Sequence, residues 1–354
     1  MTPVALPLDE ALRLLAEGHS LSTLQAASAM GVLMSGSASH DEAAAFLLAL
    51  RAKGESADEV AGAASALREA MTPLPIADRE SLVDTCGTGG GRVGTLNIST
   101  GAAFLAVGAG VRVAKHGNRS HTSRSGSADV LEALGIQVEL PPVEAAQLLA
   151  DTGFTFLYAP RYHPAMRHVA PVRRRLGVPT MMNILGPLAN PARAGRQVIG
   201  TAEPGMAPLM AEALRRLGTV HALVVHGEVG LDEVSPAGVT RAWEVREGSL
   251  REWTIDPGAH GLAAPDLGPL AGGEPAENAG RLERLLEGGE GEEVVRSALV
   301  LNAAAAVYVS GLARDYGEAI ALAQTALEEG KGGEALARIR AAAPAAPTSR
   351  AGAA

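Results

Sequence analysis

Glycines and small polar residues gather in one stretch of the sequence where they could bind an anion. Residues 86–91 (CGTGGG) follow an apolar segment that is typical of a buried strand, and residues 95–100 (TLNIST) then open a predicted helix. Glycines let backbone amides approach an anion closely, and the free amides of a helix N-terminus favour phosphate. The glycines alone would fit a plain tight turn equally well. Together with Asn97, Ser99 and Thr100 they favour anion binding, although the spacing is neither a Walker loop nor a dinucleotide fingerprint.

A second polar segment follows the next predicted strand. Residues 115–120 (KHGNRS) place cations among hydroxyl and glycine residues, and the polar character continues through Arg124 to Ser127. A solvated loop would account for Lys115 and Arg124, but not for the small polar residues beside the glycines. Ligands of parallel sheets bind outside the carboxyl ends of the strands. The segment therefore favours a ligand site at that edge.

A third cluster combines histidine, arginine, asparagine and proline. It consists of residues 163–168 (HPAMRH), 171–173 (PVR) and 183–188 (NILGPL). An arginine held by neighbouring prolines can present its guanidinium to a carboxylate. Arg173 is followed by Arg174 and Arg175, so the composition alone does not decide which of the three points inward.

A fourth cluster is acidic. His226-Gly227-Glu228 and then Asp232-Glu233 come just after a predicted strand. Adjacent carboxylates at a strand end suit Mg²⁺ that bridges a pyrophosphate, although many acidic pairs are merely exposed turns. All four clusters are predicted to lie at strand ends, where one cleft can collect them.

The composition indicates a globular chain that does not bind nucleic acid in general. Of 354 residues, 47% are hydrophobic, 19% are charged and 3% are aromatic, and the formal net charge is −9. Few aromatic rings leave few platforms for stacking bases, and a negative chain repels a polyanion. Cys86 is the only cysteine, which excludes an internal disulfide and a cysteine-built zinc site. We expect it to act as a small buried apolar residue rather than as a catalyst.

No apolar run in the sequence reaches the roughly 20 residues that span a bilayer, and the first residues lack the pattern of a signal peptide. These features predict a cytoplasmic protein with no membrane partner.

The order of the predicted elements gives the fold class. Residues 8–71 are predicted to be helical only, with Ser22, Ser39 and Ser56 as caps, and Pro73 and Pro75 then break the pattern. Strands and helices alternate afterwards, which predicts an α/β fold: a small all-helical domain plus a large α/β domain with a mostly parallel central sheet flanked by helices. The predicted strands are 81–86, 111–114, 154–158, 197–201 and 222–225, followed by a hairpin over 241–253 with its turn at Glu247 and Gly248.

With these motifs in this order, the sequence resembles the anthranilate phosphoribosyltransferases. The resemblance is carried by residues 84–126, 163–191 and 232–233, and it covers nearly the whole chain, including the helical start. It implies a magnesium-dependent enzyme of tryptophan biosynthesis. The reaction transfers the phosphoribosyl group of phosphoribosyl pyrophosphate to the amine of anthranilate and releases pyrophosphate.

The resemblance also implies the ligand-binding residues, but no general base. Phosphoribosyl pyrophosphate would be bound by Gly87, Gly90, Gly91, Thr95, Asn97, Ser99, Thr100, Lys115, His116, Gly117, Asn118, Arg119, Ser120, Ser123 and Ser127. Anthranilate would lie near Gly87, Asn118, His163, Arg173 and Gly186, with Arg173 facing its carboxylate. Mg²⁺ would be bound by Ser99, Asp232 and Glu233. Most relatives carry Asp where this chain has Gly91, which puts one polar contact at the pyrophosphate end in doubt.

The implied organisation is a homodimer that forms through the small domain. The small domain would comprise residues 1–72 with a later segment near 173–190, and the large domain 76–172 and 191–342. We expect residues 343–354 to be a disordered tail.

Two rival functions stay open at the level of the sequence. A pyrimidine nucleoside phosphorylase shares the fold and a similar glycine loop, but the sequence shows no set of residues for uracil or thymine. A nucleic-acid-binding relative without this activity is the second rival. The acidic balance and the presence of Asn118 and Arg173 count against it.

Overall fold

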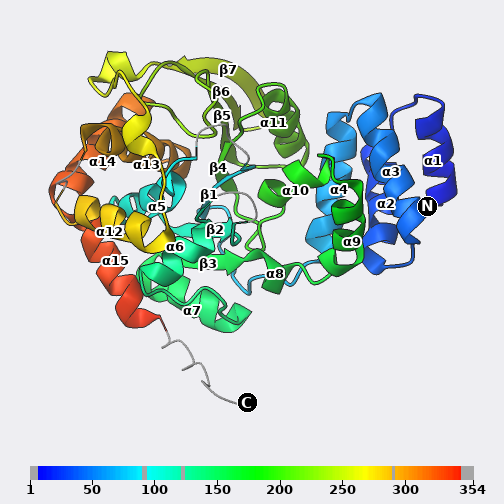
Figure 1. Ribbon diagram of the computed structural model, residues 1–354, viewed down its shortest axis with the longest axis horizontal. Coiled ribbons are helices and arrows are strands. Elements are labelled where there is room, and N and C mark those ends of the chain that lie inside the picture. Colours follow the sequence, from blue (N-terminus) through cyan, green and yellow to red (C-terminus); the bar gives the residue numbers. More distant parts are fainter. Residues whose placement is uncertain (1–6, 90–93, 121–123, 289–291, 344–354) are drawn as a thin grey trace.

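Four helices form the N-terminal part of the molecule, and serine caps set where three of them begin. The computed structural model describes residues 7–89, 94–120, 124–288 and 292–343. Its first helices are α1 (Leu8–Ala16), α2 (Thr23–Ser35), α3 (His40–Lys53) and α4 (Ala57–Ala70), which lie together at one end of the molecule (Figure 1). Ser22, Ser39 and Ser56 each form a capping box, as the sequence predicted.

A seven-stranded sheet forms the centre of the remaining chain. Its strands are β1 (Val83–Gly87), β2 (Val113–Gly117), β3 (Phe154–Tyr158), β4 (Arg196–Gly200), β5 (His221–Gly227), β6 (Thr240–Arg246) and β7 (Ser249–Ile255). Their order is β3-β2-β1-β4-β5-β6-β7, in which β1 to β5 run parallel. The antiparallel pair β6–β7 turns at Glu247 and Gly248, both with positive φ, which confirms the predicted hairpin. The sheet is therefore mostly parallel, and the ends of β1, β2, β4 and β5 share one edge.

Helices cover both faces of the sheet. They are α5 (Ile98–Gly108), α6 (Ser127–Ala133), α7 (Pro142–Thr152), α11 (Met206–Arg216), α12 (Pro275–Leu286), α13 (Glu293–Ser310), α14 (Tyr316–Glu328) and α15 (Lys331–Ala342). Within the described residues, α13 alone is long and apolar enough to cross a membrane by length and composition, and 78% of it is buried inside the fold. It packs in the main core cluster with α5 and α14 (Figure 1).

Three short helices connect the sheet to the helical part, and the sequence pattern did not predict them. They are α8 (Ala159–Tyr162), α9 (Met166–Leu176) and α10 (Met182–Leu188). Both α9 and α10 contain an internal proline, Pro171 and Pro187, which usually ends a helix because its ring removes a hydrogen bond. Val169 and Val172 are buried in the same cluster as α1 to α4, and this packing offsets the lost hydrogen bond.

At the sheet edge opposite the glycine loop, a buried carboxylate ties three elements together. Glu244 on β6 is 1% exposed and hydrogen-bonds His221 Nε2 and the Tyr308 hydroxyl at 2.9 Å each, while Arg251 Nε donates to it at 2.8 Å. Burial alone would raise the pKa of Glu244, but these hydrogen bonds outweigh it and lower the pKa from 4.5 to about 2. The ionised form of Glu244 is therefore favoured by folding.

We predict that Glu244→Gln lowers the free energy of unfolding at pH 7 by about 2–3 kcal/mol. Because the pKa is depressed in the folded state, the stabilisation is present above 4.5 and is lost as the pH falls toward 2. Urea unfolding of both proteins across this range measures the difference. Glu252→Gln is the matched control, since Glu252 forms an exposed pair with Arg241 on the neighbouring strand. A difference that does not change with pH would contradict the prediction.

Candidate active site

The acidic pair Asp232-Glu233 lies against the ends of two strands because glycines leave room for it. A Cβ on Gly200, the last residue of β4, would overlap the backbone oxygen of Asp232. A Cβ on Gly87, at the end of β1, would lie 3.4 Å from Asp232 Oδ2. The glycine loop is fixed here as well, since the Thr88 N–H donates to Gly200 O at 2.9 Å. The glycine loop and the acidic pair therefore meet at one point of the sheet edge.

A lysine and a serine complete this cluster. Lys115 in the middle of β2 is 1% exposed, and its Nζ donates to Ser99 Oγ at 3.2 Å and to the backbone oxygen of Thr85. The Ser99 N–H at the start of α5 donates to Glu233 Oε1 at 3.2 Å. Lys115 is thus no part of a solvated loop. We call Ser99, Lys115, Asp232 and Glu233 the charged cluster.

The electrostatics of the charged cluster suit an added cation. Burial and the neighbouring Asp232 raise the pKa of Glu233 to about 8, and burial also raises the pKa of Asp232. Burial lowers the pKa of Lys115, although Asp84 opposes this shift. A divalent cation would offset the repulsion between the two carboxylates. The described residues contain no group of three or more His, Cys, Asp or Glu that could hold a metal, and Mg²⁺ typically needs only one or two carboxylates beside substrate phosphates and water.

The second polar segment folds back onto the strand that precedes it. Ser127 Oγ donates to the backbone oxygen of Asn118 at 3.2 Å, and a Cβ on Gly117 would overlap this hydroxyl. At the start of α5, Thr100 Oγ1 is buried and has no partner among the described residues. These groups border the charged cluster with small donors and acceptors.

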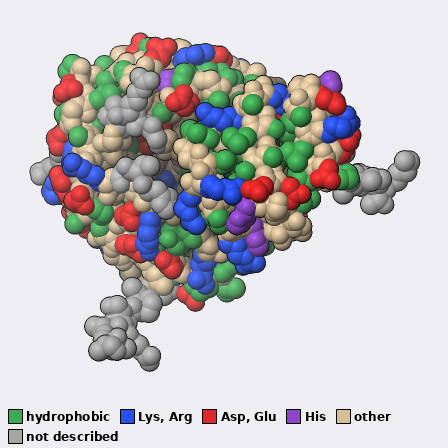
Figure 2. All heavy atoms as spheres, turned by 45° about the vertical axis from the view of Figure 1, so that its right-hand side comes forward, with side chains coloured by type: hydrophobic (Ala, Val, Ile, Leu, Met, Phe, Trp, Pro, Cys, Tyr) green, Lys and Arg blue, Asp and Glu red, His purple; other side chains and the backbone are tan. Residues whose placement is uncertain are grey.

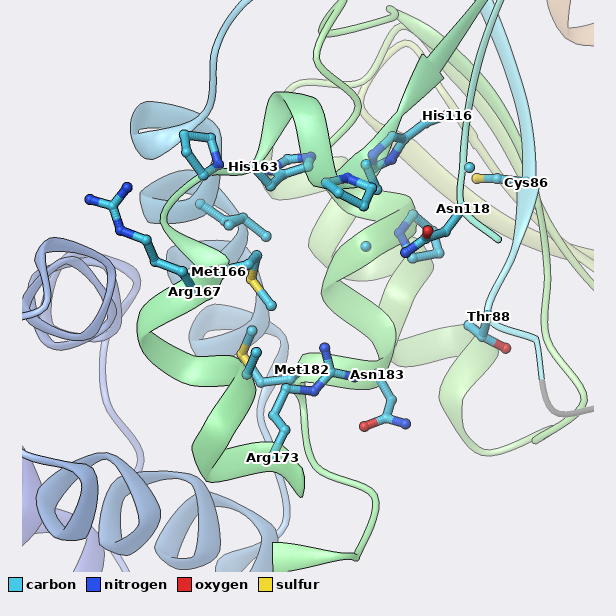
Figure 3. A pocket seen from close by; sticks show the side chains of 18 residues that line it. Cys86, Thr88, His116, Asn118, His163, Met166, Arg167, Arg173, Met182 and Asn183 are labelled. Carbon is cyan, nitrogen blue, oxygen red and sulfur yellow. The ribbon is translucent and has the colours of Figure 1, made fainter. Parts of the chain in front are cut away.

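A cavity of about 570 Å³ opens from this edge toward the helical part. It is lined by residues of the glycine loop, the second polar segment and the helices α9 and α10, among them Thr88, His116, Gly117, Asn118, His163, Arg173, Asn183 and Gly186 (Figure 3). Arg173 extends into it from α9, whereas Arg167 points away from the other labelled residues (Figure 3). The exposed residues Arg174 and Arg175 do not line the cavity, and Arg175 pairs with Asp41 at 2.8 Å. Of the three arginines, Arg173 is therefore the one that faces the cavity.

Two histidines form a neutral wall of this cavity. The rings of His116 and His163 lie 5.0 Å apart, and burial lowers their pKa values to about 3 and about 4. Backbone hydrogen bonds at Gly186 and Ala189 oppose the two shifts, but burial outweighs them. Arg167 and Arg173 also line the cavity, and burial lowers the pKa of Arg173.

Other predicted residues lie further from the cavity or outside the described part of the chain. The Arg119 guanidinium pairs with Glu132 and Glu139 and lies over the ring of Tyr158, so it is engaged on the α6 side. Thr95 pairs with Ala271 in an isolated bridge, and the Ser120 N–H donates to Asp129 Oδ2 at 3.0 Å. Gly90, Gly91 and Ser123, and the tail after residue 343, lie outside the described residues.

The cavity is also lined by Cys86 and by three residues that were not among the predicted site residues. Cys86 is half-buried and lines the cavity, so it is less buried than expected, and burial raises the pKa of its thiol well above the ordinary value. Thr88, Met166 and Met182 also line the cavity, and no pattern in the sequence marked them as functional residues. Thr88 lies within the glycine loop and could have been included from its position. The two methionines carry no signal that separates them from ordinary core residues.

The fold and this site define a two-domain glycosyltransferase. The family described as "Glycosyl transferase family, helical bundle domain" matches residues 9–71, and the family described as "Glycosyl transferase family, a/b domain" matches residues 79–333.

Individual relatives narrow the class further. The anthranilate phosphoribosyltransferase of Rubrobacter xylanophilus is 48% identical over 94% of this chain and 96% of its own length. The crystal structure of the enzyme from Thermus thermophilus has a TM-score of 0.87 at 44% identity and covers 94% of this chain and 98% of its own. A Saccharomyces cerevisiae structure in complex with PRPP and Mg has a TM-score of 0.85 at 29% identity and covers 95% of this chain and 97% of its own. The chain belongs to the anthranilate phosphoribosyltransferase family, which confirms the predicted family and fold class.

We predict that Gly200→Ala reduces kcat/KM by about 100-fold while the protein still folds, because the new methyl group would push the backbone of Asp232 away from the strand ends. Steady-state turnover and the melting temperature of both proteins measure this. Gly205→Ala is the matched control, since it has ordinary φ and ψ values and no atom within 4 Å of an added Cβ. Equal activities of the two variants would contradict the role of Gly200.

Proposed function

We propose that this chain transfers the phosphoribosyl group of phosphoribosyl pyrophosphate to the amine of anthranilate, as a step of tryptophan biosynthesis, in the cleft between the charged cluster and Arg173. One observation carries the proposal. A single cavity joins Arg173, His163 and Gly186 to Gly117 and Asn118, which belong to the polar segment that begins at Lys115 of the charged cluster. An anion with phosphates and an aromatic carboxylate can therefore be held side by side.

The two substrates enter at different ends of this cleft. Arg173 offers a planar guanidinium to the anthranilate carboxylate, and the neutral His116 and His163 flank the aromatic ring. Small donors at the ends of β1 and β2 and at the start of α5 hold the phosphates. A related yeast enzyme has been solved in complex with PRPP and Mg, and again in complex with 4-fluoroanthranilate, which supports these two classes of substrate.

Ser99, Asp232 and Glu233 would hold Mg²⁺, which supplies positive charge to a pyrophosphate leaving group when it is bound. Lys115 adds a fixed positive charge beside Ser99 Oγ. The carbon C1 of the ribose gains positive charge as its bond to pyrophosphate breaks, and the anthranilate amine forms the new bond from the opposite face, which inverts C1. The chain's residues act by positioning and by electrostatics.

We assign no general base. An aromatic amine is weakly basic, so its lone pair is free at neutral pH and needs no strong base to expose it. The neutral histidines therefore serve the cavity as uncharged walls in this proposal.

Assembly and location stay proposals as well. A small domain of residues 1–72 with the segment near 173–190 would dimerise with a second copy of itself. Leu24 is 69% exposed, Leu48 40% and Val178 42%, and apolar side chains are interspersed over the helical part that Figure 2 turns toward the viewer. A cytoplasmic location stays a prediction.

We predict that Arg173→Ala raises KM for anthranilate about ten- to hundredfold and leaves KM for phosphoribosyl pyrophosphate within about twofold, because the variant loses one charged hydrogen bond to the carboxylate. Steady-state fluorescence assays at varied concentrations of each substrate measure both constants. Arg174→Ala is the matched control: it removes an adjacent, exposed arginine of the same helix. Equal increases of both KM values would indicate a structural role for Arg173.

We predict that replacing both Asp232 and Glu233 by Ala abolishes turnover at any Mg²⁺ concentration. The metal-free variant should be at least as stable as the wild type at pH 8. The sign follows from the raised pKa of Glu233. Between pH 4.5 and about 8 the carboxyl ionises in the unfolded state but not in the folded state, so the wild type loses stability as the pH rises. The variant lacks this carboxyl and does not lose that stability. Turnover and urea unfolding in EDTA test the two parts. Wild-type turnover by the variant, or in EDTA, would exclude the metal assignment.

A further inference from the structure

A side-chain network behind the start of α5 ends on a residue that neither the sequence motifs nor the cavity contains. Asn278, on the first turn of α12, is 1% exposed, and its Nδ2 donates to Asn97 Oδ1 at 3.1 Å. Ser125 Oγ donates to the same oxygen at 3.1 Å, and Asn97 Nδ2 donates to the Ser125 backbone oxygen at 3.1 Å. Asn97 is one of the residues predicted to bind phosphoribosyl pyrophosphate.

This network fixes which way the Asn97 amide points. A carboxamide has an oxygen with two lone pairs and a nitrogen with two hydrogens. Asn278 and Ser125 occupy both lone pairs of Asn97 Oδ1, and Ser125 takes one of the two hydrogens. The second hydrogen has no acceptor in the part of the chain that the structure describes. The half-buried Asn97 therefore has one N–H left for a ligand.

The orientation of Asn278 is itself fixed from the backbone. Its Oδ1 accepts a hydrogen bond from the Gly273 N–H at 2.8 Å, so its Nδ2 must be the atom that faces Asn97. An exchange of the two Asn278 atoms would place two oxygens against each other at Asn97 and two hydrogen donors against each other at Gly273. The backbone at Gly273 thus determines the orientation of Asn278, and Asn278 determines that of Asn97 together with Ser125.

The segment that carries this network lies directly against the predicted phosphate-binding segment. The Leu96 N–H donates to Leu270 O at 2.8 Å, and the Gly272 N–H donates to Gly94 O at 2.9 Å. A Cβ on Gly272 would lie 2.6 Å from the backbone oxygen of Thr95, so only glycine allows this approach. In Figure 1, α12 lies beside α6 and near α5. Backbone hydrogen bonds between residues 94–96 and residues 270–272 therefore hold the segments that carry Asn97 and Asn278 together.

We propose that Asn278 is a positioning residue for phosphoribosyl pyrophosphate: it holds the Asn97 carboxamide so that its remaining N–H, and not its oxygen, faces the phosphates. The proposal rests on the proposed function. Phosphate oxygens accept hydrogen bonds and repel a carbonyl oxygen, so an amide that flips turns an attraction into a repulsion. Asn278 acts through Asn97 and needs no contact with the substrate.

The most direct test is Asn278→Asp, which replaces only the side-chain NH₂ group by an oxygen. The carboxylate still accepts from the Gly273 N–H, but the donor to Asn97 becomes an acceptor and favours the flipped amide. We expect KM for phosphoribosyl pyrophosphate to rise about ten- to hundredfold, and about two- to tenfold in Asn278→Ala, where Ser125 alone still holds the amide. KM for anthranilate should stay within about twofold in both variants.

Asn278→Asp also adds a negative charge, and a double-mutant cycle separates this charge from the flip. In an Asn97→Ala background no amide is left to orient, so Asn278→Asp should raise KM for phosphoribosyl pyrophosphate no further. An equal rise in both backgrounds would mean charge repulsion and would overturn the proposal. If Asn278→Asp does not fold, the same cycle with Asn278→Ser decides.

Two controls distinguish positioning from general damage. Thr152→Val removes a buried hydrogen bond to Leu148 O on α7, and it should lower the melting temperature without changing either KM. Wild-type turnover of the two substrates is measured first: its absence would refute the proposed function itself. With wild-type turnover present, equal increases of both KM values in the Asn278 variants would refute only the role of Asn278.

Discussion

Two adjacent carboxylates, Asp232 and Glu233, are held close together at the carboxyl edge of a parallel sheet, and most of the site is arranged around this repulsion. Glycines at the ends of β1 and β4 admit the pair, and Lys115 brings the nearest positive charge to Ser99, beside Glu233. Burial, and then the charge of Asp232, raise the pKa of Glu233 to about 8, and Lys115 and the Ser99 N–H offset this shift only in part. A fold that keeps such a cluster sacrifices stability for a place where a cation and phosphates are favoured.

The second substrate requires the opposite arrangement, and the helical part of the molecule provides it. Arg173 is positioned by α9, which packs against α2 and α3. The neutral His116 and His163 line the same cavity as Arg173.

Local patterns predicted the parts of the fold that local physics determines. The serine caps located α2 to α4, and the alternation of apolar runs with amphipathic stretches located every parallel strand to within a few residues. The helices α9 and α10 were missed because Pro171 and Pro187 argue against a helix, while the tertiary packing that overrides them is not visible in a sequence. The choice of Arg173 over its two neighbours depended on that same helix. Asn278 gave no signal, since its partner Asn97 is 181 positions away along the chain.

Helices behind the sheet hold the polar walls of the site in a fixed orientation. Asn302 on α13 accepts from the Val234 N–H and donates to Val234 O, both at 2.9 Å, so it clamps the residue that follows Glu233. Asn278 on α12 similarly reaches the start of α5. Each amide is buried and satisfied by backbone or side-chain groups, and a buried amide that flips would lose its hydrogen bonds at a cost of about 1–3 kcal/mol for each unsatisfied group. Such networks fix donors before a ligand arrives, so that the binding energy of the substrate is not spent on orienting them.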